Sequence, residues 1–132
     1  MSTPENTDEI IAANQAFYDA HEARDAEAMF HLWVDDEAVS CTHPGWATLL
    51  GAAEVQASWR AILDGPGRNQ FILTNILARV DGDAGWVTCD ENIVAPGGTT
   101  TVAALNCFVR TPDGWRLTAH HGSPVFSQHP KE

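Results

Sequence analysis

Three polar residues in the C-terminal half of the chain could carry out acid–base chemistry: Glu91, Asn106 and His121. Each stands alone among apolar residues at alternate positions, a spacing that places side chains on one face of a strand. The apolar companions are Cys89 and Ile93 for Glu91, Ala104 and Phe108 for Asn106, and Leu117 and Ala119 for His121. A buried polar group without a hydrogen-bond partner costs about 1–3 kcal/mol. The three side chains must therefore satisfy one another, or bind water or a ligand.

General acid–base catalysis is the chemistry that this set allows. Glu91 would orient the imidazole of His121, which would act as base or acid near neutral pH. Asn106 would polarise a carbonyl or hydroxyl group of the substrate. The alternative is a buried polar network that fixes the strand register and does no chemistry. The sequence leaves both interpretations open.

Other candidate residues would form a binding site around this set. His43 precedes Pro44 and Gly45 in a predicted loop, where binding residues often lie. We expect it either to make a structural hydrogen bond or to lie at the rim of a pocket. The expected apolar walls are Phe17, Trp33, Trp46, Trp59 and Phe108. We expect no metal and no cofactor, because no H-x-H, H-E-x-x-H or paired-cysteine spacing occurs.

Composition excludes some partners. Seven basic and eighteen acidic residues among 132 give a net charge of −11, which repels nucleic-acid phosphates and anionic lipids. The sequence has no apolar stretch long enough to cross a bilayer and no signal-peptide core. Three cysteines without paired spacing favour buried thiols in a reducing compartment. We therefore expect a cytoplasmic protein that binds neither nucleic acid nor membrane.

Helical patterns come first along the chain and strand patterns follow. A helix is expected to begin at Thr7 and to be broken by Arg24-Asp25. Shorter helices are expected over 26–33 and 51–63, with a strand over 38–42, followed by strands over 71–80, 85–94, 99–110 and 115–121. This order predicts one α+β domain over residues 7–126 between flexible tails at 1–6 and 127–132. Helices packed on one face of a curved antiparallel sheet would leave a concavity for a small molecule.

Several motifs carry a resemblance to a known family. They are Leu32-Trp33-Val34-Asp35-Asp36, Thr42-His43-Pro44 followed by Leu50-Gly51, and Asp113-Gly114-Trp115-Arg116 followed by His120-His121-Gly122-Ser123-Pro124. Over residues 7–126 the chain resembles the SnoaL-like branch of the nuclear transport factor 2 superfamily, near the association (hub) domain of calcium/calmodulin-dependent kinases. The resemblance implies a cone-like fold with Glu91, Asn106 and His121 facing its pocket. It also implies a homodimer formed through the outer sheet face.

Departures from the family narrow the chemistry. A ketosteroid isomerase of this fold needs a tyrosine and two aspartates where this chain has Phe17, Cys41 and Asn106, so that reaction is not expected. The arginines that hold a carboxylate in the kinase hub are similarly replaced by Asn106 and Glu91. We therefore expect an acid–base enzyme of isomerase, cyclase or hydrolase type acting on a small, neutral, apolar or carbonyl-bearing molecule. The alternative is a non-catalytic binding or oligomerisation module.

Overall fold

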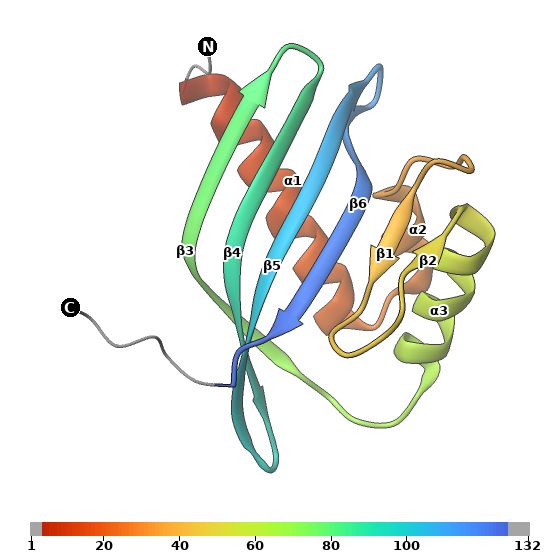
Figure 1. Ribbon diagram of the computed structural model, residues 1–132, viewed down its shortest axis with the longest axis vertical. Coiled ribbons are helices and arrows are strands. Elements are labelled where there is room, and N and C mark those ends of the chain that lie inside the picture. The colour runs from red at the N-terminus through yellow and green to blue at the C-terminus, as the bar shows by residue number, and fades with distance from the viewer. Residues whose placement is uncertain (1–3, 127–132) are drawn as a thin grey trace.

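The computed structural model describes residues 4–126 as three helices and a curved six-stranded sheet (Figure 1). The helices are α1 (Pro4–Ala23), α2 (Ala26–His31) and α3 (Ala52–Asp64). The strands are β1 (Ser40–Thr42), β2 (Leu49–Leu50), β3 (Gln70–Asp81), β4 (Ala84–Ala95), β5 (Gly98–Thr111) and β6 (Gly114–Pro124). Their order in the sheet is β2-β1-β6-β5-β4-β3, and every neighbouring pair is antiparallel except β1 with β6. The predicted α+β class with a curved sheet is confirmed.

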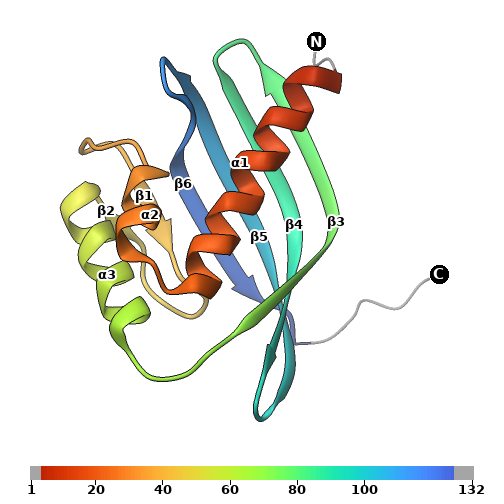
Figure 2. The ribbon, with the colours of Figure 1, turned by 180° about the vertical axis from the view of Figure 1, so that it is seen from behind.

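Helix α1 crosses one face of the sheet, and the core lies between them (Figure 2). The buried side of α1 carries Ile10, Phe17 and Tyr18, which are spaced to share one half of a helix. Helix α3 adds Val55 and Trp59 beside β1 and β2. Figure 1 looks onto the opposite sheet face, over which no helix of residues 4–126 lies. The inner face of the sheet is therefore covered by α1, and its outer face is left uncovered by these helices.

Most element boundaries follow the predicted punctuation. Helix α1 ends at Ala23 because Arg24 takes a left-handed conformation (φ 57°), and Asp25 then caps α2 by accepting a hydrogen bond from Ala28 N at 3.1 Å. The start of α1 was placed too late, since the helix begins at Pro4 and not at Thr7. Proline suits a first turn, where its missing N–H is not needed. The remaining tail residues, 1–3 and 127–132, lie outside the described residues.

A β-bulge in β6 overturns the predicted facing of that strand. Phe108 of β5 pairs with Leu117, but Cys107 pairs with Ala119, so Thr118 is an extra residue in β6. Beyond the bulge the alternation of side chains is shifted by one residue. Leu117 and His120 are consequently buried on the α1 side, whereas His121 is exposed on the other. The prediction that His121 faces the pocket was therefore wrong.

Close approach of α1 to β4 depends on a glycine. A Cβ atom on Gly85 would lie 2.5 Å from Ile10 Cδ1 and 2.8 Å from Arg79 O. The second atom is backbone, which cannot rotate away. Gly85 thus allows the N-terminal half of α1 to rest on the sheet.

We expect Gly85→Ala to destabilise the protein by about 1–3 kcal/mol, because the added methyl overfills this contact. Urea denaturation measures the loss as a lower midpoint. Gly97→Ala is the matched control, since a Cβ there would have no neighbour within 4 Å. Equal midpoints for both variants would contradict the packing argument.

Candidate functional site

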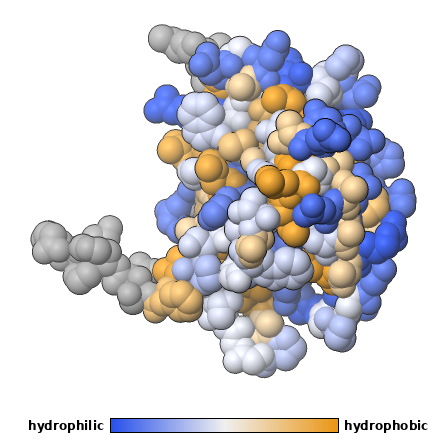
Figure 3. All heavy atoms as spheres, turned by 45° about the vertical axis from the view of Figure 1, so that its right-hand side comes forward, coloured by the Kyte–Doolittle hydropathy of each residue, from blue (hydrophilic) through white to orange (hydrophobic). Residues whose placement is uncertain are grey.

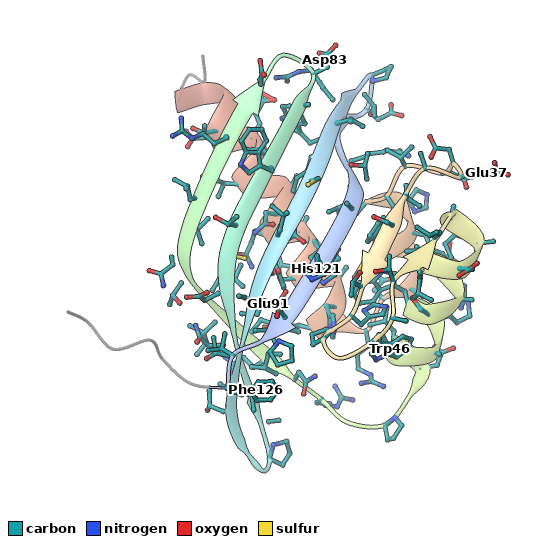
Figure 4. All side chains as sticks on the ribbon, in the orientation of Figure 1. Glu37, Trp46, Asp83, Glu91, His121 and Phe126 are labelled. Carbon is teal, nitrogen blue, oxygen red and sulfur yellow. The ribbon has the colours of Figure 1, made fainter. Side chains whose placement is uncertain are left out.

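An inner cavity of about 270 Å³ opens between α1, α3 and the sheet. Its lining comprises Phe17, Tyr18 and His21 of α1, His43, Pro44 and Trp46 after β1, Trp59 and Ile62 of α3, Asn69 and Phe71 at the start of β3, Glu91 and Ile93 of β4, and His120 of β6. Trp46 lies in the connection between β1 and β2, close to α3 (Figure 4), and is 48% exposed, which places it at the rim. The cavity is therefore walled mainly by aromatic rings, and its polar groups come from Glu91, Asn69, Tyr18 and three histidines.

Hydrogen bonds join the cavity to a buried polar network centred on Asn106. The Asn106 amide nitrogen donates to Tyr18 Oη at 3.1 Å and to Asn14 Oδ1 at 2.8 Å. Tyr18 Oη in turn donates to Glu91 Oε2 at 2.5 Å. On the other side, His120 Nδ1 donates to Asn106 Oδ1 at 2.5 Å. The network links α1 with β4, β5 and β6 across the floor of the cavity.

Glu91 has the environment of an acid–base group. Its side chain is buried against the cavity, and burial raises the pKa of its carboxyl to about 7, although the hydrogen bond from Tyr18 opposes the rise. Burial and the neighbouring Glu91 raise the pKa of Tyr18 above its usual range, so Tyr18 keeps its proton. Near neutral pH, Glu91 can therefore either accept or release a proton.

Histidines at the cavity are neutral for the same reason. Burial lowers the pKa of His120 to about 3 and that of His43 to about 4, and it also lowers the pKa of His21. Because a carbonyl oxygen only accepts hydrogen bonds, His120 Nδ1 carries the proton and its Nε2 is an acceptor. Ser58 Oγ donates to Val55 O, so it accepts from His43 Nε2 at 2.9 Å, and His43 Nδ1 is left as an acceptor.

The structure brings together only part of the predicted site. Glu91 and Asn106 belong to one network, while His121 lies on the outer face (Figure 4). Among the expected ligand-binding residues, Phe17, His43, Trp46 and Trp59 line the cavity. Trp33 and Phe108 do not line it but pack in the core, because they lie deeper between helices and sheet.

Tyr18 and His120 were missed as site residues. A signal for Tyr18 exists in the sequence, because Asn14, Tyr18 and His21 recur at the spacing of one helical face. For His120 the sequence carries no such signal, since the doublet His120-His121 offers a histidine to either face and the bulge makes the choice.

Cysteines, metals and membrane spans add no other site. The three cysteines are free thiols, and Cys107 is half-buried rather than fully buried. Within residues 4–126, no group of three or more His, Cys, Asp or Glu side chains could hold a metal ion. No helix in that same stretch is long and apolar enough to cross a membrane.

Comparisons with known proteins agree with the fold. Residues 10–127 match the family model described as SnoaL-like domain. The crystal structure of a proposed dehydratase from the NTF2-like family of Streptomyces avermitilis is 42% identical, covers 95% of this chain and all of its own, and has a TM-score of 0.88. A proposed calcium/calmodulin-dependent protein kinase type II association domain from Thiobacillus denitrificans is 34% identical, with coverages of 95% and 97% and a TM-score of 0.79. F-box protein SKIP8 of Arabidopsis thaliana is 27% identical over 114 residues, or 86% of this chain, which spans about half (48%) of that longer protein.

The raised pKa of Glu91 predicts a pH-dependent stability. In the folded state this carboxyl keeps its proton up to about pH 7, whereas an exposed glutamate loses it near 4.5. Glu91 therefore contributes fully to the free energy of unfolding below its pKa in the unfolded chain, near 4.5. That contribution is lost as the pH rises toward and past 7. We expect the unfolding free energy to fall, relative to Glu91→Gln, by roughly 2 kcal/mol between pH 5 and pH 8.

Urea denaturation of the wild type and Glu91→Gln at each pH measures this difference. The histidines have lowered pKa values, so they make the unfolding free energy rise with pH. Because both proteins contain them, their contribution cancels in the comparison. Asp90→Asn removes the same charge on the opposite face of β4 and should keep the pH dependence. If both variants lost the pH dependence of the unfolding free energy equally, that dependence would come from net charge and not from the burial of Glu91.

Proposed function

Since this chain belongs to the SnoaL-like domain family, we propose that its inner cavity binds a small, largely apolar molecule and acts on it by acid–base catalysis through Glu91. One observation carries the proposal: a carboxyl with a pKa of about 7 lies buried in an aromatic cavity of about 270 Å³. General acids and bases are most effective when their pKa lies near the pH at which the enzyme works. Perturbed carboxyls in clefts are characteristic of functional sites.

Each neighbour of Glu91 has a role in this scheme. Glu91 takes a proton from the substrate as a carboxylate and later returns it. Tyr18 stabilises the carboxylate form by donating a hydrogen bond to it. Asn106 is a positioning residue, because it holds Tyr18 and sets which nitrogen of His120 is protonated. His120 Nε2 faces the bound molecule as a hydrogen-bond acceptor. In this scheme Glu91, and not His121, is the general acid and base.

The reaction class follows from this machinery. Isomerisation, cyclisation and hydrolysis each need a group that removes a proton and returns it. Dehydration needs the same exchange, and the similarity to a proposed dehydratase supports it for this chain. Free thiols at all three cysteines support a reducing compartment such as the cytoplasm.

We expect two variants to separate binding from catalysis. Ile93→Trp should fill the cavity and abolish the thermal shift and ligand-observed NMR signals of small carbonyl compounds, alcohols and amines found to bind the wild type. Glu91→Gln should keep the binding of neutral compounds but lower turnover of any converted compound by about 10²–10⁴-fold. Ile72→Trp, on the outer face and already 50% exposed, is the control that leaves both unchanged. Binding that survives Ile93→Trp would refute the cavity as the site.

A second role, self-association, is favoured by the outer sheet face. Leu77, Thr88, Leu105 and His121 form a row of paired residues across β3, β4, β5 and β6, and Trp86 lies on the same face. Leu77 is 57% and Leu105 40% exposed. Figure 3 shows this side of the molecule obliquely, with several hydrophobic spots among hydrophilic residues. We propose that a second copy covers this face, as the similarity to an association domain supports.

We expect Leu77→Asp with Leu105→Asp to convert a wild-type dimer into a folded monomer, because each carboxylate would be buried without a partner. Size-exclusion chromatography with light scattering gives the mass. Ala57→Asp, at an exposed position of α3 and not on the sheet, should leave the dimer intact. A monomeric wild type would remove the proposal of self-association and leave the cavity proposal untouched.

A further inference from the structure

Aromatic rings surround the inner cavity in a continuous chain. Successive ring centroids lie 4.8, 4.7, 5.3, 4.6 and 5.4 Å apart in the order Trp46, His43, Trp59, His21, Phe71 and Tyr18, which we call the aromatic belt. Adjoining rings are steeply inclined, at 70°, 86°, 87°, 72° and 53°, like the walls of a box. The faces of aromatic rings carry partial negative charge and attract cations.

Beside the Asn69 amide and the His21 ring, which can both donate and accept hydrogen bonds, three polar groups at the cavity are acceptors. Glu91 offers carboxylate oxygens, and His120 Nε2 has no hydrogen-bond partner among residues 4–126. His43 Nδ1 is a third acceptor, with only Cys41 Sγ nearby at 3.9 Å. The indole N–H of Trp59 lacks a partner in the described part of the chain but is fully buried, so a ligand in the cavity does not reach it. A complementary ligand must therefore bring its own donors.

Charge at the cavity points the same way. Glu91 is the only carboxylate of the described lining, which includes no lysine or arginine. Arg24 does not line this cavity but an adjoining one of about 130 Å³, which shares His21, Ile62 and Asn69 with it. The Arg24 guanidinium donates to Gly67 O. An anionic ligand would meet the Glu91 carboxylate without a compensating cation, at a high desolvation cost. A net charge of −11 also raises the local concentration of cations.

We propose that the cavity takes a small amine, bound as its ammonium cation, with the nitrogen at Glu91 and His120 and the apolar part inside the aromatic belt. This inference rests on the proposed function and names the substrate class of the same site. The N–H groups of an ammonium match the acceptors of Glu91, His120 and His43, and its charge is shared between the carboxylate and the ring faces. The proton that Glu91 exchanges is then one on or next to that nitrogen.

The ionisable groups around Glu91 determine how ligand affinity should depend on pH. The groups facing Glu91 and the cavity are Tyr18 and His21 from α1, His43 from the loop after β1, His120 from β6, and Cys89 from β4 itself. Across the sheet its paired neighbours, Leu73 and Val102, do not ionise. Tyr18 and Cys89 have raised pKa values, and the three histidines have lowered ones. Between pH 6 and pH 8 the Glu91 carboxyl is therefore the group whose charge changes most, since its pKa is about 7.

Calorimetric titration with four probes of one shape tests the inference: benzylammonium, benzyl alcohol, acetophenone and benzoate. At pH 8 we expect benzylammonium to bind at least about tenfold more tightly than benzyl alcohol and acetophenone, with no binding of benzoate. From pH 8 to pH 6 its affinity should fall about tenfold, because the ionised fraction of Glu91 falls from about 0.9 to about 0.1. The affinity of benzyl alcohol should change little.

Glu91→Gln should abolish both the preference for benzylammonium and its pH dependence, while Asp90→Asn, which removes the same charge on the outer face, keeps them. Tyr18→Phe provides a second variant in case Glu91→Gln does not fold; it should lower the preference less, since it retains the carboxylate. Tighter binding of acetophenone or benzoate, or an unchanged preference in Glu91→Gln, would overturn the amine inference and leave the cavity as a binding site. Failure of all four probes to bind would count against the amine inference and the proposed function together.

Discussion

The hydrogen bonds of Asn106 hold the structure together around its cavity. This side chain has no solvent exposure, and it reaches α1 through Asn14 and Tyr18 and β6 through His120. A buried amide that loses its partners costs about 1–3 kcal/mol, so the network disfavours any other rotation of α1 over the sheet. The position of the cavity walls on α1 depends on that rotation. Polar specificity and the shape of the apolar cavity are therefore consequences of one arrangement.

Glu91 shows what such a network costs a small domain. Burying a carboxyl in an aromatic cavity raises its pKa to about 7, which means that its charged form is disfavoured by the fold. A leucine at this position would fill the same space without that cost. A carboxyl at this position is explained by the proposed acid–base role, in which Glu91 must take up and release a proton. Tyr18 limits the cost by donating to it, and neutral His43 and His120 avoid a fixed positive charge that would hold it ionised.

The two proposed roles lie on opposite faces of the sheet, and the bulge at Thr118 divides the residues of β6 between these faces. Before the bulge Leu117 packs in the core, and after it His120 enters the network. His121 is left in the row of residues on the outer face beside Leu105. The proposed binding face and the proposed association face can change independently, because alternate residues of one strand belong to each of them.

The sequence by itself determined the class of fold, the order of the elements and, together with the family resemblance, the inward facing of Glu91 and Asn106. Local chemistry decides these features: helical spacing in α1, glycine and proline at the turns, and strict alternation along β4 and β5. Only the tertiary structure decided which histidine joins the site, because a bulge arises from pairing with a neighbouring strand and leaves no mark on the strand that contains it. The separation of Trp59 at the cavity from Trp33 in the core was likewise decided by packing. Both lie in stretches predicted as helices, but α2 ends at His31 and Trp33 forms a β-bridge with Leu117. The carboxyl of Glu91 was visible in the sequence, but its pKa was not, since that depends on how deeply α1 and the sheet bury it.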